Sequence, residues 1–291
     1  MNVLSLFDGI SCGMVALKRA GIEVNKYVAY EIEEDAITVS KFNHPEIEHR
    51  GDVFNAEYAE GEFDLIIGGS PCTHWSIAKR GERETKASGI GWELFNQYAR
   101  AIKEVKPKYF LYENNASMSD EIKECISKEL GCEPITINSA DFSAQNRIRY
   151  YWTNIKIEEW QPSNILFSDI MDDEYEISRS IEKYKDTYKY SRNGLDIKWD
   201  TGRKGHYSQA NRAKKVNQKW NTVCANRAES KGNVWLDEHT IRLITMSELE
   251  KLQTLPVGYT SCLRSKEKRS KGIGNGWTVD VIAHIFKGLK V

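Results

Sequence analysis

The sequence lacks the features that mark membrane, secreted and metal-binding proteins. None of its apolar runs approaches the roughly 18 residues that a spanning helix needs, which excludes a membrane-embedded protein. Its first residues, MNVLSLFDGIS, contain neither a basic leader nor a cleavage site, so we do not expect secretion. The six cysteines form no C-x-x-C pair, and there are only six histidines. We therefore expect no metal site, and reduced thiols in the cytoplasm.

The composition is that of an ordinary globular protein. Hydrophobic residues make up 40% of the chain and charged residues 29%, which excludes disordered, collagen-like and coiled-coil classes. A length of 291 residues allows one large domain or two smaller ones.

The charge of the chain is balanced overall but unevenly distributed. The formal net charge is −1, yet residues 179–232 hold fourteen Lys or Arg and five Asp or Glu, a local net charge of +9. Aromatic residues lie among these bases, namely Tyr184, Tyr188, Tyr190, Trp199, Tyr207 and Trp220. This pattern is typical of a segment that contacts phosphates, and a solvated lysine-rich loop region has the same composition.

The first half of the chain alternates strand and helix signals. Short apolar runs at residues 3–7, 27–30, 63–67 and 109–112 predict strands, and residues 12–20 and 33–42 predict helices between them. Continuous apolar strands separated by helices indicate an α/β fold with a mostly parallel sheet that is covered on both faces. The alternation fails from about residue 153 to residue 240 and helical patterns return afterwards. We therefore expect one domain from residues 1–152 and 241–291, and a small second domain from residues 153–240.

Acidic residues follow three successive predicted strands. Asp8 and Gly9 join the first strand to a helix, Glu31 ends the second strand, and Asp52 ends the third. The turn is not G-x-G-x-x-G, so a dinucleotide site is not favoured. Each acid alone is compatible with an ordinary turn or cap, whereas the three together favour an adenosyl ligand with its ribose hydroxyls on a carboxylate.

A cysteine and a glutamate follow the next two strands. Cys72 comes after Ser-Pro in a loop, and Glu113 ends the following strand. Adjacent parallel strands end side by side, so both side chains can face one cavity. Arg147 and Arg149 are two residues apart, and in an extended segment both would point to one side and bind a phosphate or a base oxygen together. The alternative for this pair is surface charge on an edge strand.

Six motifs along the chain resemble the ordered motif set of the 5-cytosine DNA methyltransferases. They are Phe7-Asp8-Gly9, Pro71-Cys72, Glu113-Asn114, Gln145-x-Arg147-x-Arg149, Arg242-x-x-Thr245-x-x-Glu248-x-x-x-Leu252-Gln253 and Gly274-Asn275-Gly276-Trp277-x-Val279. The details look most like the catalytic domain of the de novo class. Two residues depart from the pattern, because Asn115 stands where the family usually has an apolar residue and Gly276 where a serine is common.

The resemblance implies a fold and a chemistry. It implies a Rossmann-like class I methyltransferase sheet with helices on both faces, plus a small target-recognition domain. The target cytosine would be flipped out of the duplex, and the Cys72 thiolate would add to carbon 6 of its ring. Glu113 would bind ring nitrogen 3 and the exocyclic amine, Arg149 would hold the ring oxygen, and Arg147 would order the catalytic loop or a phosphate.

The resemblance also implies a methyl donor and a nucleic-acid partner. S-adenosyl-L-methionine would lie against Phe7, Asp8, Gly9, Glu31, Ile32, Asp52, Val53, Asn275, Gly276 and Trp277. Residues 79–91 match the mobile catalytic loop of the family. By the resemblance, double-stranded DNA would contact Ser76 and Thr222. From the basic segment itself we expect Lys214 and Lys215 to contact phosphates, and Arg227, five residues after Thr222, is the candidate for reading a base.

The expected protein is a stand-alone bacterial or phage DNA methyltransferase of the restriction-modification type, with no oligomeric state assigned. One alternative is an RNA cytosine methyltransferase, since one branch of this family acts on transfer RNA. Another is an inert DNA-binding regulator, against which the intact set of Cys72, Glu113, Arg147 and Arg149 argues. A zinc-dependent base deaminase is excluded, because the sequence has no H-x-E with P-C-x-x-C.

Overall fold

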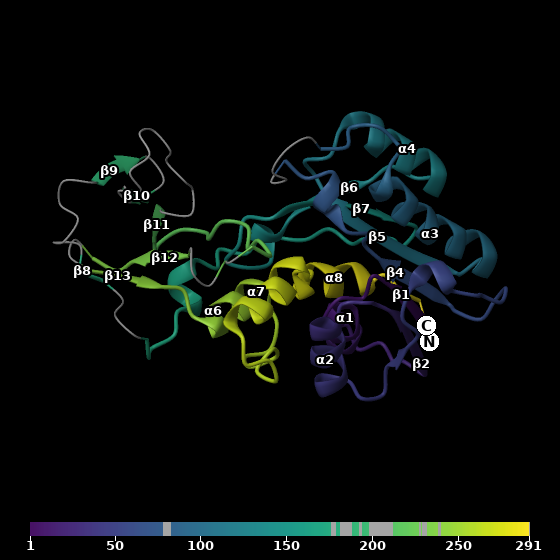
Figure 1. Cartoon of the computed structure of the whole chain (residues 1–291), viewed down its shortest axis with the longest axis horizontal. Coiled ribbons are helices and arrows are strands. Elements are labelled where there is room, and N and C mark those ends of the chain that lie inside the picture. Colours follow the sequence, from purple (N-terminus) through teal and green to yellow (C-terminus); the bar gives the residue numbers. More distant parts are fainter. Residues whose placement is uncertain are drawn as a thin grey trace. The chain divides into compact units, whose positions relative to one another are not determined.

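The computed structural model describes residues 1–77, 83–175, 179–180, 188–191, 194–197, 212–226, 228, 232–237 and 240–290 (Figure 1). Contacts within the chain divide it into two compact units. The first comprises Met1–Asn138, Ile148–Gln161 and Val279–Val291, and the second comprises Ser139–Arg147 and Pro162–Thr278.

The first unit is built on a seven-stranded sheet in the order β3-β2-β1-β4-β5-β7-β6. Its strands are β1 (Asn2–Leu6), β2 (Lys26–Tyr30), β3 (Glu48–His49), β4 (Leu65–Gly68), β5 (Tyr109–Asn115), β6 (Ile135–Asn138) and β7 (Ile148–Thr153). The strands from β3 to β5 pair in parallel, and β7 pairs antiparallel with both β5 and β6.

Helices cover both faces of this sheet, with α3 and α4 on one face and α1, α2 and α8 on the other (Figure 1). Their bounds are α1 (Cys12–Arg19), α2 (Glu34–Asn43), α3 (Ile90–Val105), α4 (Asp120–Leu130) and α8 (Val279–Phe286). Because both faces are covered, all four residues of β4, LIIG, are buried. The predicted α/β fold with a mostly parallel, helix-covered sheet is confirmed.

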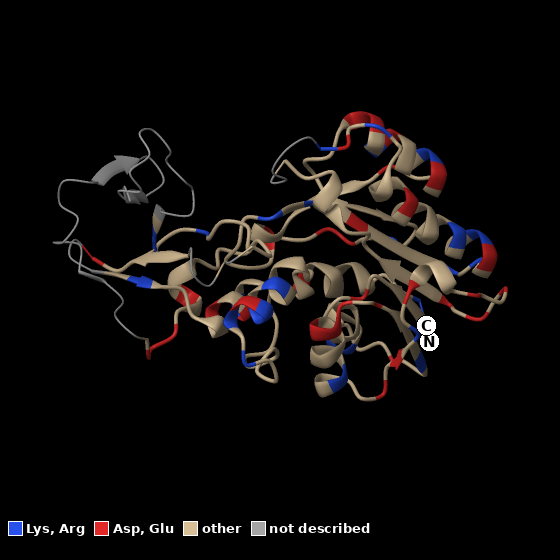
Figure 2. Ribbon diagram, in the orientation of Figure 1, with Lys and Arg blue, Asp and Glu red and all other residues tan. Residues whose placement is uncertain are grey.

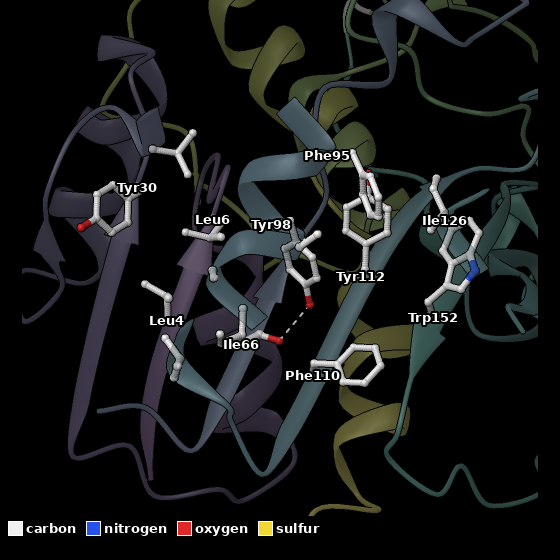
Figure 3. Packing of buried hydrophobic residues seen from close by; sticks show 14 of the residues in the cluster. Leu4, Leu6, Tyr30, Ile66, Phe95, Tyr98, Phe110, Tyr112, Ile126 and Trp152 are labelled. Atoms are coloured by element: carbon white, nitrogen blue, oxygen red, sulfur yellow. Dashed lines mark hydrogen bonds between the residues drawn. The ribbon is translucent and has the colours of Figure 1, made fainter. Parts of the chain in front are cut away.

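Alternate residues of the strands build a large hydrophobic core beneath α3 and α4 (Figure 3). Leu4, Leu6 and Ile66 from the central strands pack there, together with aromatic side chains from β5, β7 and the helices. The ring of Tyr112 lies 4.8 Å from that of Tyr98 and 5.7 Å from that of Trp152, between centroids. This aromatic layer supports the strands at the edge where the sheet-end loops begin.

The helix boundaries follow from local sequence signals. The side chain of Ser119 caps α4 by accepting the Ile122 amide, and Gly131 ends the helix in the left-handed conformation at φ 72°. On the other face α1 approaches the sheet closely at Gly13, where an added Cβ would lie 2.4 Å from Ile67 Cδ1. A larger residue at position 13 would require the ends of the Ile67 and Tyr27 side chains to move.

One strand is longer than its apolar run predicts. The run ends before Glu113, but β5 continues to Asn115 because β7 pairs antiparallel with it as far as Arg149. The prediction that Glu113 ends its strand was therefore wrong by two residues, since a neighbouring strand supplied hydrogen bonds that the sequence pattern does not show.

The second unit contains a six-stranded sheet in the order β8-β13-β12-β11-β10-β9. Its strands are β8 (Arg179–Ser180), β9 (Tyr188–Ser191), β10 (Gly194–Ile197), β11 (Arg212–Lys215), β12 (Asn233–Trp235) and β13 (Thr240–Leu243), and its helices are α6 (Met246–Leu252) and α7 (Lys266–Asn275). The pairing is antiparallel except between β11 and β12.

A buried ion pair joins β13 to α6 in this unit. Arg242 donates to Glu248 Oε2 over 2.8 Å, and the side chains of both residues are 0% exposed. Glu248 also forms a capping box with Thr245 at the start of α6, and the Arg242 guanidinium lies 4.5 Å from the centroid of the Tyr175 ring. The charge of each partner is thus compensated inside the unit.

The two units do not follow the expected domain boundary. Residues 139–147 and 241–278 belong by their contacts to the second unit, although the sequence pattern assigns residues 1–152 and 241–291 to one domain. The functional division of the chain at residues 153 and 240 stays a prediction. Among the helices that the structure describes, none is long and apolar enough to cross a membrane.

Removing one partner of the buried ion pair should destabilise the second unit strongly. Glu248→Ala leaves the Arg242 charge buried and uncompensated, so we expect a loss of about 3–5 kcal/mol in the free energy of unfolding, measured by urea denaturation. The control is Glu60→Ala, which breaks the exposed pair with Lys106 and should cost under about 1 kcal/mol. Equal losses in the two variants would contradict this assignment.

Candidate active site

Cys72 lies in a short turn directly after β4. It begins the 3₁₀ helix η2 (Cys72–His74) and is partly exposed, as expected of a loop position and not of a core cysteine. The amides of Trp75 and Ser76 donate to the Cys72 carbonyl over 3.1 and 3.0 Å, and the Trp75 side chain is fully buried. The buried indole ring of Trp75 therefore anchors the C-terminal end of the turn.

Glu113 lies in β5 and forms an ion pair with an arginine of the neighbouring strand. Arg149 Nε approaches Glu113 Oε1 to 3.0 Å, and the side chains are 14% and 11% exposed. The register of β5 and β7 places Asn115 opposite Arg149 and Glu113 opposite Tyr151, so the pair crosses the ladder diagonally. Arg149 thus orients the carboxylate of Glu113.

The segments that carry Cys72 and Glu113 are neighbours. Gly68 at the end of β4 lies opposite Tyr112 in β5. Beyond this point, Asn114 Nδ2 donates to the carbonyl of Ser70 over 3.1 Å. This hydrogen bond ties the residue after Glu113 to the residue two before Cys72.

Arg147 and Arg149 do not act as a pair, which corrects the prediction made from their spacing. Arg147 is 4% exposed, and its guanidinium donates to the carbonyls of Val223, Gly274 and Gly276 over 3.0–3.2 Å. Arg149 instead pairs with Glu113. The expectation failed because Arg147 lies before β7 begins. The two residues are therefore not in one strand, and their side chains do not point to the same side. The alternative of exposed surface charge was also wrong.

The loop after β1 is held by the side chain of Asp8. Its carboxylate accepts hydrogen bonds from Ser5 over 2.6 Å, from Tyr27 over 2.8 Å and from Ser11. Burial raises the pKa of Asp8 from 3.8 to about 6, and the three hydroxyl donors only partly offset it. The Asp8 carboxylate thus binds hydroxyl groups of β1, β2 and the loop, and its contact with a cofactor stays a prediction.

Glu31 fixes the same loop from the end of β2. Its Oε2 accepts the Gly9 amide over 2.8 Å, and its Oε1 accepts the amides of Ile32 and Glu33 over 2.8 and 2.9 Å. A carboxylate has about four acceptor positions, so these three bonds leave capacity on Oε2 for a ligand hydroxyl. The positive φ values of Phe7, Gly9 and Ser11, 57–60°, show that the backbone is tightly turned here.

The third acidic position caps a short helix. Asp52 Oδ1 accepts the Phe54 amide over 3.0 Å at the start of η1 (Val53–Asn55). Val53 is buried, whereas Phe54 is 49% exposed and Ile32, next to Glu31, is 65% exposed. The contact of Val53 with a cofactor stays a prediction. Phe54, two residues after Asp52, is an exposed aromatic residue that the sequence pattern did not single out.

The remaining expected cofactor contacts lie in the second unit. Asn275 ends α7, Gly276 follows it, and the Gly276 carbonyl accepts hydrogen bonds from Arg147 and Gln253. The role of Asn275, Gly276 and Trp277 toward a cofactor stays a prediction.

The candidate DNA contacts differ in their surroundings. Thr222 donates its hydroxyl to the Asn146 carbonyl over 2.7 Å, and Ser76 lies in the turn after Cys72. Lys214 is 8% exposed, which is a poor position for a phosphate contact, whereas Lys215 is exposed and lies 4.9 Å from the centroid of the Trp235 ring. Arg227 lies outside the described residues.

Another lysine of the basic segment has a structural role. Lys219 Nζ donates to the carbonyls of Ala140, Ser143 and Ser163 over 2.6–3.1 Å. Elsewhere both basic and acidic residues occur on α3, α4, α6 and α7 (Figure 2). The part of the chain that the structure describes contains no group of three or more His, Cys, Asp or Glu that could hold a metal ion.

Comparison with known families identifies the family of this chain. The model of the family described as C-5 cytosine-specific DNA methylase matches residues 1–291. The chain belongs to this family. The resemblance that the six motifs of this chain showed is thereby confirmed.

Curated relatives of the chain come from phages and bacteria. It is 33% identical to the orphan methyltransferase M.SPRI of Bacillus phage SPR over 55% of this chain and 40% of that protein. It is 26% identical to the type II methyltransferase M.FnuDI of Fusobacterium nucleatum over 100% of this chain and 94% of that protein. The chain thus spans less than half of the length of the phage relative.

Solved structures share the fold. The Entamoeba histolytica methyltransferase EhMeth superposes with a TM-score of 0.71 at 15% identity, covering 100% of this chain and 99% of that one. The S. pombe Dnmt2 methyltransferase gives a TM-score of 0.65 at 15% identity, covering 98% of this chain and 97% of that one. The expected Rossmann-like class I methyltransferase fold is confirmed.

The raised pKa of Asp8 predicts a pH-dependent stability difference. The folded chain holds this proton more tightly than the unfolded chain, so the contribution of Asp8 to stability falls as the pH rises from about 4 to about 6. Against Asp8→Asn, wild type should lose relative stability over this window, by at most about 1.4 kcal/mol per pH unit. Denaturant titrations from pH 4.5 to 7.5 measure it, and a difference that is flat with pH would contradict the assignment.

Proposed function

We propose that this chain transfers a methyl group from S-adenosyl-L-methionine to carbon 5 of a cytosine in double-stranded DNA. The supporting observation is the position of the Cys72 turn beside the Glu113–Arg149 ion pair, with the two segments tied by the bond from Asn114 to Ser70. A thiol, a carboxylate and a guanidinium at one sheet edge are suited to a ring that must be attacked, held and polarised.

The residues have distinct tasks in this chemistry. The target cytosine leaves the stack, because carbon 5 and carbon 6 are otherwise covered by neighbouring bases. The Cys72 thiolate forms a bond to carbon 6, and carbon 5 gains electron density. Glu113 binds nitrogen 3 and the exocyclic amine, and Arg149, which orients Glu113, holds the ring oxygen. After methylation, loss of the carbon 5 proton breaks the bond between Cys72 and carbon 6.

The polar and apolar groups at the ends of β2 and β3 suit a methyl donor that carries a nucleoside. Glu31 keeps acceptor capacity on Oε2 for a ribose hydroxyl, and Asp52 lies beside the next strand end. The exposed side chains of Ile32 and Phe54 offer apolar surface for a purine ring. When bound, S-adenosyl-L-methionine supplies an electrophilic methyl group.

DNA binding is proposed for the basic segment and the turn at Thr222. Phosphate contacts supply affinity without sequence information, and Lys215 is the described lysine best exposed for one. Arg147 holds the carbonyl of Val223, next to Thr222, so it supports this turn instead of contacting a phosphate itself. Residues 153–240 are the proposed target-recognition segment, with Arg227 as the candidate for base contact.

The direct test is expression in a host that lacks cytosine methylation, followed by bisulfite sequencing of the host DNA. We expect 5-methylcytosine at a short recurrent sequence. Methylated transfer RNA with unmethylated DNA would favour the RNA cytosine methyltransferase instead, and no methylation of either would remove the enzymatic proposal.

The nucleophile can be tested by substitution and trapping. Cys72→Ser should lower methyl transfer at least about 1,000-fold while DNA binding stays within about twofold, because a hydroxyl is not ionised at neutral pH. DNA with 5-fluorocytosine should trap the wild-type chain covalently, since carbon 5 then has no proton to lose. The matched control is Cys224→Ser, an exposed cysteine that should remain active and trappable. Turnover near the wild-type rate in Cys72→Ser would contradict the mechanism.

The methyl-donor site can be tested by calorimetry. Glu31→Ala should weaken binding of S-adenosyl-L-methionine by about 1–3 kcal/mol, because a hydrogen bond to a charged acceptor is lost and the loop at Gly9 loosens. Glu34→Ala, an exposed acid three residues away at the start of α2, is the control and should bind normally. Unchanged affinity in Glu31→Ala would remove Glu31 from the site.

A further inference from the structure

Four buried polar side chains lie directly behind the Cys72 turn. Ser70, Tyr112, Asn114 and Asn115 are 3%, 0%, 1% and 4% exposed. Their hydrogen bonds form one continuous chain between the end of β4 and the end of β5. Buried polar groups are costly unless each is satisfied, so such a chain tolerates few alternative geometries.

Asn115 sets the orientation of the Asn114 amide. The backbone amide and Nδ2 of Asn115 donate to Asn114 Oδ1 over 2.8 and 3.2 Å. The Asn114 oxygen therefore faces Asn115, and its nitrogen faces the other way. Asn114 Nδ2 then donates to the Ser70 carbonyl and to the Tyr112 hydroxyl, each over 3.1 Å.

The Tyr112 hydroxyl completes the connection to the segment before Cys72. It accepts a hydrogen bond from Asn114 Nδ2 and forms a second one with Ser70 Oγ, 2.6 Å away. Burial raises the pKa of this hydroxyl, so it remains a proton donor at neutral pH. The ring is held between Phe95, Tyr98 and Trp152, with centroids 4.8–5.7 Å apart (Figure 3). The hydroxyl consequently has a fixed position.

Asn115 also reaches the segment after Cys72. Its Oδ1 accepts the amide and hydroxyl of Ser117 over 3.0 and 2.7 Å. Ser117 in turn accepts the Ile77 amide over 3.4 Å on its hydroxyl, and a hydrogen bond from Arg83 on its carbonyl. The Asn115 side chain is therefore connected to both sides of the Cys72 turn. Asn114 links it to Ser70, before the turn, and Ser117 links it to Ile77, after the turn.

We propose that Tyr112 and Asn115 are positioning residues for the nucleophile, which act through Ser70, Asn114 and Ser117 to hold the backbone on both sides of Cys72. Neither residue contacts a reacting atom. The proposal rests on the proposed function, because it assigns the Cys72 turn as the part whose geometry matters for reaction. It also gives the polar residue Asn115 a role that an apolar side chain at this place could not perform.

The test compares two buried tyrosines of the same core. Tyr112→Phe removes the hydroxyl that joins Asn114 to Ser70. Tyr98→Phe is the matched control, because its hydroxyl is equally buried but donates to the Ile66 carbonyl inside β4, over 3.2 Å (Figure 3). Tyr112→Phe loses two buried hydrogen bonds and Tyr98→Phe loses one, so both thermal stabilities should fall, and that of Tyr112→Phe by more.

Methyl transfer provides the first readout. With saturating DNA and methyl donor, we expect the single-turnover rate of Tyr112→Phe to fall about tenfold while its DNA affinity stays within twofold, and the rate of Tyr98→Phe to match wild type. Asn115→Leu should show the same pattern as Tyr112→Phe. The double variant should be little slower than the slower single variant, because both residues act through one chain of contacts.

Alkylation provides a second readout that needs no methylation. Peptide-resolved mass spectrometry with iodoacetamide should show Cys72 reacting at least threefold faster in Tyr112→Phe than in wild type or Tyr98→Phe, because the loosened turn exposes the thiol. Buried Cys12 should stay unreactive in all three, which excludes global unfolding. A wild-type chain inactive on DNA would overturn the proposed function, and the alkylation result would still decide the positioning role. Equal Cys72 reactivity in the two tyrosine variants would overturn the positioning proposal.

Discussion

The side-by-side pairing of β4 and β5 is the constraint on which the candidate site depends. Two parallel strands end at the same edge of a sheet, so the turn after β4 and the end of β5 meet whatever their sequences are. The sheet itself is held by an aromatic core under α3 and α4, and Tyr112 belongs both to that core and to the polar chain behind Cys72. The packing of the interior therefore helps to fix the position of the Cys72 thiol.

Three carboxylates of this protein serve as internal acceptors. Asp8 collects three hydroxyl donors, Glu31 collects three backbone amides, and Glu248 compensates a fully buried arginine. Each holds a loop or a helix start that would otherwise contain unsatisfied donors. A buried carboxylate is costly, but here it holds a tightly turned backbone, as in the loop after β1, where Phe7, Gly9 and Ser11 have positive φ.

Basic residues of the second unit divide into two groups in the structure. Lys219 and Arg147 direct their charges at backbone carbonyls and so hold segments of the second unit together. Lys215 remains at the surface, where a phosphate can reach it. Composition identifies the basic segment, but it does not show which of its lysines bind backbone carbonyls and which are free to bind phosphate. The residue type is the same in both cases.

The sequence by itself determined four strands and two helices in the first half of the chain and the loop positions of Cys72, Glu31 and Asp52, because apolar runs and turn residues are local signals. Six ordered motifs also sufficed to identify the family. Only the tertiary structure decided the length of β5, the separate partners of Arg147 and Arg149, and the inward direction of the Asp8 carboxylate. These depend on which segments become neighbours after folding, namely β7 beside β5, Val223 and Gly276 beside Arg147, and Tyr27 beside Asp8. A side chain's partner is set by distances in space, which residue spacing along the chain does not encode.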